Sequence, residues 1–244
     1  MWGISITLGV GYSGRKMRKA SANKYIIGID EVGRGALAGP VMVAAAMVPA
    51  GRFDLLKDSK KLLPWQREAW CAYFKNSGEV RFAVARVYPR GIERMNISAA
   101  ANRAALSAFM QLIKKTNSKE RENGKGRKNA SVQKKEIKIN SRSIAVFLDG
   151  GLFLESRAAQ KDHAPRALTI IKGDEKIPAV AAASIVAKVT RDRFMVKLAK
   201  RYPAYSFEVH KGYGTKVHMK AIAKNGPCEA HRLTFLHKGP IIKA

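Results

Sequence analysis

The chain has 244 residues, and 46% of them are hydrophobic, which is enough to build a buried core and excludes an intrinsically disordered chain. Lysine and arginine number 46 against 18 aspartate and glutamate residues, so the formal net charge is +28. A surface this basic attracts polyanions, most commonly nucleic acid, but charge by itself does not separate an enzyme from a chromatin-like or ribosomal binding protein.

Three features of the sequence predict a cytoplasmic protein. The two cysteines, Cys71 and Cys228, lack the spacing of a metal site and are expected to be reduced thiols. The longest uncharged stretch, residues 36–51, contains glycine and proline and is too short for a membrane span. No basic segment precedes an apolar one at the N-terminus, so we expect no signal peptide and no membrane contact.

The first half of the chain alternates predicted strands and helices. Residues 1–24 are basic and rich in small residues, and we expect a flexible arm there. Order is predicted to begin at Tyr25 with a buried, β-branched strand that stops at Asp30 and Glu31. After a glycine-rich turn, the expected elements are a buried strand at 41–48, a helix that begins at Pro64, a strand at 80–88 and a helix at 97–113.

The second half begins with a polar, lysine-rich stretch, residues 114–142, which predicts a solvated insertion. The expected elements after it are a buried strand at 144–148 that ends at Asp149, a short strand at 167–171, a helix at 177–201, and turns and short helices from 202 to 244. Strands followed by long helices predict an α/β fold with a mixed sheet.

Carboxylates follow the predicted strands in a chain that is otherwise basic. Asp30, Glu31 and Asp149 come after hydrophobic runs, and Asp174 precedes a long helix. Parallel strands would place Asp30 and Asp149 side by side at the sheet edge where α/β proteins bind ligands. Such carboxylates repel one another unless a cation such as Mg²⁺ lies between them, and two ions of this kind support phosphodiester hydrolysis. Asp30 and Glu31 can share a site only if the strand bends there, and each carboxylate alone is equally typical of a strand end or helix cap.

Longer blocks of sequence are more specific. They are residues 28–41 (GIDEVGRGALAGPV), 58–62 (DSKKL), 148–150 (LDG), 172–174 (KGD), 181–192 (AAASIVAKVTRD) and 205–218, which contains HKGYGT. In this order, over about Tyr25 to Gly239, the blocks resemble the ribonuclease HII family of type 2 ribonucleases H. The basic arm, the long insertion and Thr234, where the family commonly has serine, depart from that pattern.

The resemblance implies an RNase H-like fold: a mixed β-sheet flanked by helices, with a small C-terminal helical extension. It implies an arm at 1–24, a catalytic domain at 25–201 that carries the insertion 114–142, and a substrate-contacting extension at 202–244. The implied activity is hydrolysis of the RNA strand of RNA–DNA hybrids and cutting on the 5′ side of ribonucleotides embedded in duplex DNA. The implied cofactor is Mg²⁺ or Mn²⁺, and we expect a monomer.

The resemblance also assigns residues to roles. The metal-binding catalytic set would be Asp30, Glu31, Asp149 and Asp174. The ribonucleotide would be read by Gly33, Arg34 and Gly35, because glycine lets the backbone approach the ribose 2′-hydroxyl that distinguishes RNA from DNA. The remaining substrate contacts would be Tyr213 against the sugar, and Lys60 and Lys211 on phosphates.

Two other functions stay open at this stage. One is a non-catalytic nucleic-acid-binding protein with a degenerate nuclease fold, against which the intact carboxylates argue. The other is a different RNase H-like nuclease such as a junction resolvase, against which the glycine turn and the Tyr213 block argue. The helical spacing of Ser184, Lys188 and Asp192 predicts a network on the helix surface. For His210, His218 and His231 we expect structural or minor phosphate-binding roles and no zinc site.

Overall fold

A single mixed sheet lies at the centre of the computed structural model, which describes residues 25–53, 56, 61–117, 144–154 and 167–236. Its strands are β1 (Tyr25–Val32), β2 (Val41–Pro49), β3 (Arg81–Val87), β4 (Ile144–Asp149) and β5 (Ala167–Ile170). The strand order is β3-β2-β1-β4-β5. β1 pairs antiparallel with β2 and parallel with β4, so the expected mixed sheet is confirmed. The arm 1–24, Lys60 and most of the insertion (118–143) lie outside the described residues.

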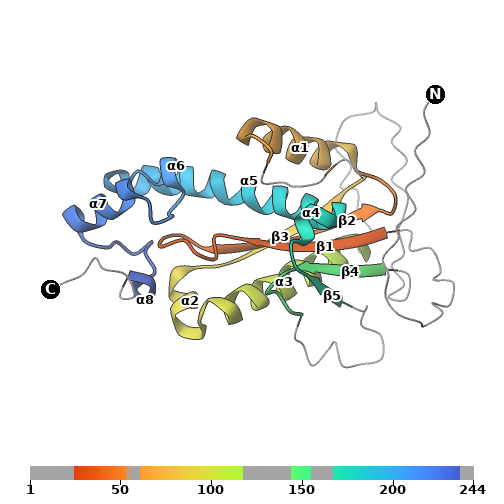
Figure 1. Ribbon diagram of the computed structural model, residues 1–244, viewed down its shortest axis with the longest axis horizontal. Helices are drawn as coiled ribbons and strands as arrows, with labels where there is room; N and C mark the ends of the chain where they lie inside the picture. The colour runs from red at the N-terminus through yellow and green to blue at the C-terminus, as the bar shows by residue number, and fades with distance from the viewer. Residues whose placement is uncertain (1–24, 54–55, 57–60, 118–143, 155–166, 237–244) are drawn as a thin grey trace, which may run out of the picture.

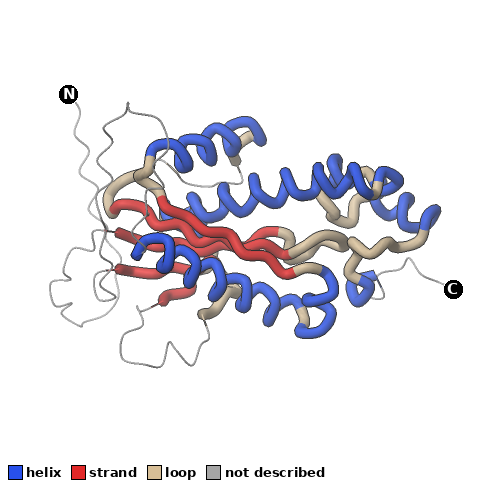
Figure 2. The backbone as a smooth tube through the Cα atoms, turned by 180° about the vertical axis from the view of Figure 1, so that it is seen from behind, coloured by secondary structure: helices blue, strands red, loops and turns tan. Residues whose placement is uncertain are grey.

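Helices cover both faces of the sheet (Figures 1 and 2). They are α1 (Pro64–Ser77), α2 (Pro89–Met95), α3 (Ile97–Asn117), α4 (Gly173–Lys176), α5 (Pro178–Arg201), α6 (Phe207–His210), α7 (Lys216–Asn225) and α8 (Leu233–Leu236), with a 3₁₀ turn at Pro203–Tyr205. One core cluster joins the sheet to α3, and a second joins its other face to α1 and α5. None of the described helices combines the length and the apolar composition needed to cross a membrane.

Helix α5 lies directly on β1 because small residues form the contact. A Cβ atom on Gly28 would lie 2.1 Å from the carbonyl carbon of Ala179, so a side chain at position 28 would overlap the helix backbone. Ala181, Ala182 and Ala183 of the same helix are fully buried. This close approach brings the middle of α5 next to the end of β1, where the predicted carboxylates lie.

Most predicted elements are confirmed; two boundaries differ by several residues, and one helix was not predicted. β1 does not stop before Asp30 but continues to Val32, because residues 30–32 keep their pairing with residues 42–44 of β2. α3 extends to Asn117, so the first residues of the predicted insertion are helical. The short helix α2 was not expected from the sequence, since its seven residues include Pro89 and Gly91.

The C-terminal segment packs as turns and short helices against the end of α5, as expected. Its core cluster joins Ala38 of the glycine-rich region and Met195 of α5 to Tyr205 and Phe207. A β-bridge between Ala38 and His231 adds a backbone connection. The residues that follow Gly33 are therefore held from one side by segments that come much later in the chain. Cys71 and Cys228 are both free thiols.

Candidate active site

A cleft of about 570 Å³ opens at the carboxyl ends of β1 and β4. Its lining contains three of the four predicted carboxylates, the glycine turn and the predicted tyrosine: Asp30, Glu31, Asp149, Gly33, Arg34, Gly35 and Tyr213. The parallel pairing of β1 with β4 ends at Ile29 and Leu148, and the next residue on each strand is an aspartate. The two strands thus place Asp30 and Asp149 together, as the sequence predicted.

Asp30 and Glu31 point to opposite faces of the sheet and still line the same cleft. Gly28 faces α5, so Asp30, two residues on, faces it too and forms a hydrogen bond with Ser184. Glu31 faces the other way, and its Oε1 accepts a hydrogen bond of 3.4 Å from Nη1 of Arg34. The expected bend in the strand is not present, because the β1–β2 ladder is continuous through Val32. The cleft wraps around the end of the strand instead.

The carboxylates of the cleft are electrostatically unfavourable in the absence of a counter-charge. Burial raises the pKa of Asp30 well above its usual range; the hydrogen bond with Ser184 opposes this rise, and the charges of Glu31, Asp149 and Asp174 add to it. Burial also raises the pKa of Glu31, against the effect of the Arg34 charge. Oε2 of Glu31 is buried and has no hydrogen-bond partner. A cation beside these oxygens would offset the repulsion between the carboxylates.

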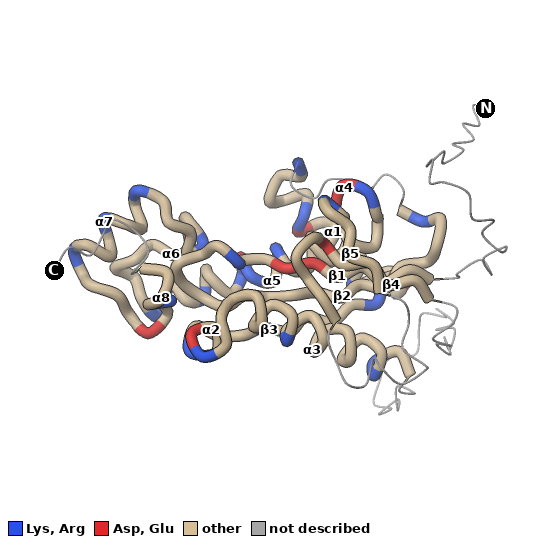
Figure 3. Tube along the Cα trace, turned by 60° about the horizontal axis from the view of Figure 1, so that its bottom comes forward, with Lys and Arg blue, Asp and Glu red and all other residues tan. Residues whose placement is uncertain are grey.

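Asp149 and Asp174 are connected through the start of α4. Oδ1 of Asp149 accepts a hydrogen bond of 2.7 Å from the backbone N–H of Gly173. The next residue, Asp174, is only 1% exposed and does not line the cleft. Within the described part of the chain, no three carboxylate, imidazole or thiol groups are gathered closely enough to form a metal-binding cluster. Three of the carboxylates therefore line the cleft, Asp174 is buried outside its lining, and the four do not converge on one point (Figure 3 shows the acidic stretches on β1 and beside α4).

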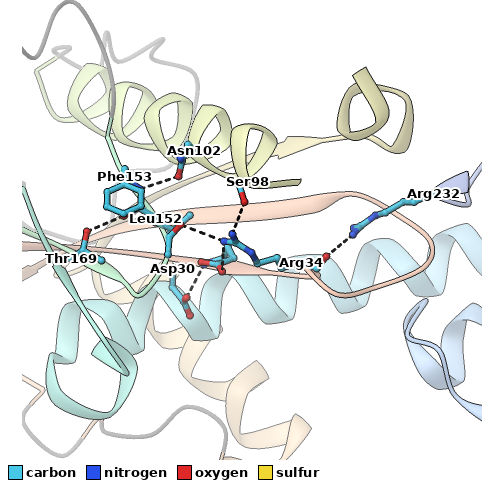
Figure 4. A network of polar contacts seen from close by, with 10 residues as sticks. Asp30, Arg34, Ser98, Asn102, Leu152, Phe153, Thr169 and Arg232 are labelled. Atoms are coloured by element: carbon cyan, nitrogen blue, oxygen red, sulfur yellow. Dashed lines mark hydrogen bonds and ion pairs between the residues drawn. The ribbon is translucent and has the colours of Figure 1, made fainter. Parts of the chain in front are cut away.

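The side chain of Arg34 is bound within the protein. Its Nη2 donates to Oγ of Ser98 at 2.9 Å, and its Nη1 donates to Glu31 and to the carbonyl of Gly151, each at 3.4 Å (Figure 4). The guanidinium group connects β1 to α3 and to the loop after β4. Because the Arg34 side chain is bound in this way, the backbone of the glycine turn faces the cleft.

Three further polar residues line the cleft, and sequence reasoning did not place them there: Arg67, Ser184 and Lys188. Arg67 comes from α1, where its guanidinium donates to the carbonyl of Leu62. Lys188 forms an ion pair with Asp192 at 2.8 Å, so this part of the predicted network on α5 is confirmed, whereas Ser184 forms its hydrogen bond with Asp30. The helical spacing on α5 gave a signal for Ser184 and Lys188, but nothing in the sequence distinguishes Arg67 from a solvent-exposed arginine.

Tyr213 belongs to the C-terminal segment and lines the cleft. The Cζ atom of Arg191 lies 5.4 Å from the centre of the Tyr213 ring. The backbone N–H of Tyr213 donates to the carbonyl of His210 at 3.0 Å. Lys211 is not in the lining of the cleft, and its ammonium group donates to the carbonyl of Glu208. Lys60 lies outside the described residues.

His210, His218 and His231 are neutral and form hydrogen bonds that support the loop carrying Tyr213. Nε2 of His210 donates to the carbonyl of Tyr205, so its Nδ1 accepts the N–H of Gly212. Nδ1 of His218 donates to the carbonyl of Tyr213, so its Nε2 accepts from Nε2 of His231 at 3.1 Å. Burial lowers the pKa of all three, that of His218 to about 4. At 0–7% exposure they are structural residues, and a phosphate-binding role does not fit.

Known proteins resemble this chain over nearly the whole described region. The family model for ribonuclease HII matches residues 27–238. A ribonuclease HII from Caldicellulosiruptor bescii is 37% identical over 215 residues, which cover 87% of each chain. The fold is similar to that of the ribonuclease H2 from Pyrococcus horikoshii OT3, with a TM-score of 0.60 and 24% identity over 86% of this chain and 93% of that one.

A second structural neighbour is Bst-RNase HIII in complex with Mn²⁺, with a TM-score of 0.58 and 18% identity over 92% of this chain and 73% of that one. The fold of both neighbours agrees with the RNase H-like architecture expected from the sequence. The family match and the curated relative agree with the geometry of the cleft, and the chain belongs to the ribonuclease HII family.

Proposed function

We propose that this protein hydrolyses the RNA strand of RNA–DNA hybrids and cuts on the 5′ side of ribonucleotides embedded in duplex DNA. One observation carries the proposal: a single cleft holds Asp30, Glu31 and Asp149 together with the turn 33–35 and Tyr213. The carboxylates suit phosphodiester hydrolysis, and the turn and the tyrosine suit recognition of a sugar. Membership of the ribonuclease HII family supports the same reaction class.

Divalent cations, Mg²⁺ or Mn²⁺, are the proposed cofactors, and Asp30, Glu31, Asp149 and Asp174 would hold them. The unpartnered, buried Oε2 of Glu31 and the raised pKa of Asp30 support this assignment, because both are relieved by a bound cation. Carboxylate oxygens are the ligands that these ions prefer, and ions that keep several waters do not need a preformed cluster. When bound, such ions activate a water molecule and stabilise the leaving oxygen of the phosphodiester.

The chain itself would supply orientation and sugar recognition. The backbone of Gly33, Arg34 and Gly35 faces the cleft and would bind the ribose 2′-hydroxyl, with Tyr213 against the sugar. Lys188 and Arg67 lie in the same cleft and would bind phosphates beside the scissile bond. Lys211 and Lys60 remain proposed phosphate contacts farther along the duplex, and the C-terminal segment would act as part of the substrate-binding surface.

The proposal is tested with three duplexes of one sequence: all DNA, DNA with a single ribonucleotide, and a continuous RNA–DNA hybrid. With Mg²⁺ or Mn²⁺ we expect cutting of the last two, and on the single-ribonucleotide duplex a 3′-hydroxyl and a 5′-phosphate end on the 5′ side of the ribonucleotide. A four-way DNA junction serves as the control substrate. Binding without cutting would support the non-catalytic alternative, and resolution of the junction would support the other nuclease class.

A further inference from the structure

The eight residues that follow β1, residues 33–40, form a glycine-rich loop that is anchored by two buried arginines. Arg191 and Arg232 are both 0% exposed, and neither forms an ion pair with a carboxylate in the described part of the chain. All their hydrogen bonds run to backbone carbonyls. Burial lowers the pKa of both groups, and the neighbouring charge of Arg191 helps to lower that of Arg232 to about 9.

Arg232 contacts the part of the loop that lines the cleft. Its Nη2 donates to the carbonyl of Gly33 at 2.7 Å. Its Nη1 donates to the carbonyl of Arg34 at 2.9 Å (Figure 4). Its Nε and Nη2 also donate to the carbonyl of Gly39, at 3.0 and 2.9 Å. One side chain thus fixes three peptide groups through the rigid fork of its guanidinium, whereas a lysine would have to reach all three from one nitrogen.

Fixing these carbonyls also fixes the amide groups on the other side of each peptide. The described chain has no cis peptide bond, and in a trans peptide the C=O of one residue and the N–H of the next point in opposite directions. The carbonyls of Gly33 and Arg34 point toward buried Arg232, so the N–H groups of Arg34 and Gly35 point away from it. Neither N–H donates to an acceptor among the described residues, and both residues line the cleft.

Arg191 connects the same loop to the loop that carries Tyr213. Its Nε and Nη2 donate to the carbonyls of Pro40 and Ala38, at 3.0 and 3.1 Å, and its Nη1 donates to the carbonyl of Lys211 at 2.9 Å. A Cβ atom on Gly33 would lie 2.1 Å from Nε of Arg191, so glycine is required where the guanidinium passes. At Gly35 a Cβ would meet nothing within 4 Å, so the cleft side of the turn is open.

We propose that Arg232 and Arg191 are positioning residues for ribonucleotide recognition: Arg232 aims the N–H groups of Arg34 and Gly35 into the cleft, and Arg191 holds the Tyr213 loop in register with them. This inference rests on the proposed function. Two buried like charges without carboxylate partners are costly for stability, and apolar side chains of similar size would serve a purely structural role at least as well. The presence of arginine at both positions is explained if Arg232 and Arg191 serve to orient the peptide groups of the loop.

The test compares Arg232→Lys with Arg193→Lys, an identical change at an exposed arginine of α5 that pairs with Glu68. Binding of the single-ribonucleotide duplex and of the all-DNA duplex is measured with Ca²⁺ in place of Mg²⁺. We expect Arg232→Lys to lower the preference for the ribonucleotide duplex about tenfold, as two hydrogen bonds weaken, with affinity for all-DNA duplex unchanged. Arg193→Lys should keep the preference. Equal weakening on both duplexes, or an unchanged preference in folded Arg232→Lys, would overturn the proposal.

A measurement on the wild-type protein covers the case in which Arg232→Lys does not fold. In residue-resolved hydrogen exchange, the amides of Arg34 and Gly35 should exchange rapidly in the free protein. They should become protected on binding the single-ribonucleotide duplex and remain unprotected with the all-DNA duplex. Protection in the free protein would contradict the proposed orientation. Failure of the wild-type enzyme to cut at ribonucleotides would instead contradict the proposed function, so the two failures are distinguishable.

Discussion

The Asp30 carboxylate is 6% exposed and feels the charges of Glu31, Asp149 and Asp174, so its ionised form is unfavourable in the metal-free protein. The site therefore holds charge that destabilises the fold, and the proposed metal ions would offset this cost. The buried charges of Arg191 and Arg232 at the glycine turn are also unfavourable, since their hydrogen bonds run only to backbone carbonyls. At the scale of single residues, the buried charges that lower the stability of the fold are concentrated around the end of β1.

Asp30→Asn should therefore stabilise the metal-free protein. A carboxylate whose pKa is raised by folding costs stability once the pH exceeds that raised value, and the cost disappears as the pH falls toward the ordinary pKa. At neutral pH we expect a melting temperature about 2–4 °C higher, which corresponds to roughly 1 kcal/mol. The difference from wild type should shrink as the pH is lowered toward 4. A lower melting temperature in chelator-treated Asp30→Asn would contradict this account.

Asp149→Asn keeps the size of the side chain and removes a negative oxygen ligand. If Asp149 holds a catalytic ion, cleavage in single-turnover assays should fall by about a hundredfold or more while duplex binding is retained. Glu79→Gln is the matched control, because Glu79 pairs with Arg52 and does not line the cleft. Near-normal cutting by Asp149→Asn would remove this residue from the metal site.

Tyr213→Ala leaves every carboxylate in place and separates recognition from chemistry. We expect its largest loss of cleavage on the single embedded ribonucleotide, where only one register of the duplex is productive. On a continuous hybrid many registers are available, so the same loss of positioning should matter less. The ratio of single-turnover rates on the two substrates is the measurement, and an unchanged ratio would argue against a role of Tyr213 at the sugar.

At the scale of elements, the hydrophobic runs predicted the five strands, and the parallel arrangement of two of them predicted the meeting of Asp30 with Asp149. The continuation of β1 through Glu31 was not predictable, because charged residues normally end a buried strand and only pairing with β2 keeps them in the ladder. Arg67, Arg191 and Arg232 were missed for a related reason. An arginine that binds backbone carbonyls looks the same in the sequence as one that is free in solvent, and only tertiary contacts separate them.

The contact between β1 and α5 can be tested at Gly28. Gly28→Ala would place a methyl group against the backbone of Ala179, and we expect a loss of about 1–3 kcal/mol in urea unfolding, as for other overpacked cores. Because the clash is with backbone atoms, the double variant Gly28→Ala/Ala179→Gly should not recover stability. Recovery would show that side chains alone determine the spacing of strand and helix.

At the scale of the whole molecule, the proposed function gives separate tasks to the net charge of +28 and to the carboxylates of the cleft. In the proposed function, lysine and arginine would neutralise phosphates along the duplex, and the carboxylates would hold the ions that cut it. Binding and cleavage should therefore respond to different ions. This division also explains why charge alone predicted a nucleic-acid partner but not an enzyme.

A chelator should abolish cleavage and leave much of the duplex binding intact. The logarithm of the binding constant should fall linearly with the logarithm of monovalent salt, with a slope of about −0.9 for each phosphate that is neutralised. Fluorescence anisotropy with labelled duplex gives the slope, and gel assays on the same samples give the cleavage. Efficient cutting in metal-free buffer, or binding that is insensitive to salt, would contradict the separation of tasks.

The anchoring of the glycine turn by Arg232 also has a consequence for synthesis of the protein. The contact between Gly33 and Arg232 joins residues that are 199 positions apart in the chain. A ribosome therefore releases the strand with Asp30 and Glu31 long before it makes the residue that orients the turn beside them. Contacts of such long range form late in folding. In the proposed function, the nascent chain thus carries Asp30 and Glu31 well before the turn beside them is held in place, and selection of ribonucleotides would begin only once the C-terminal segment has docked.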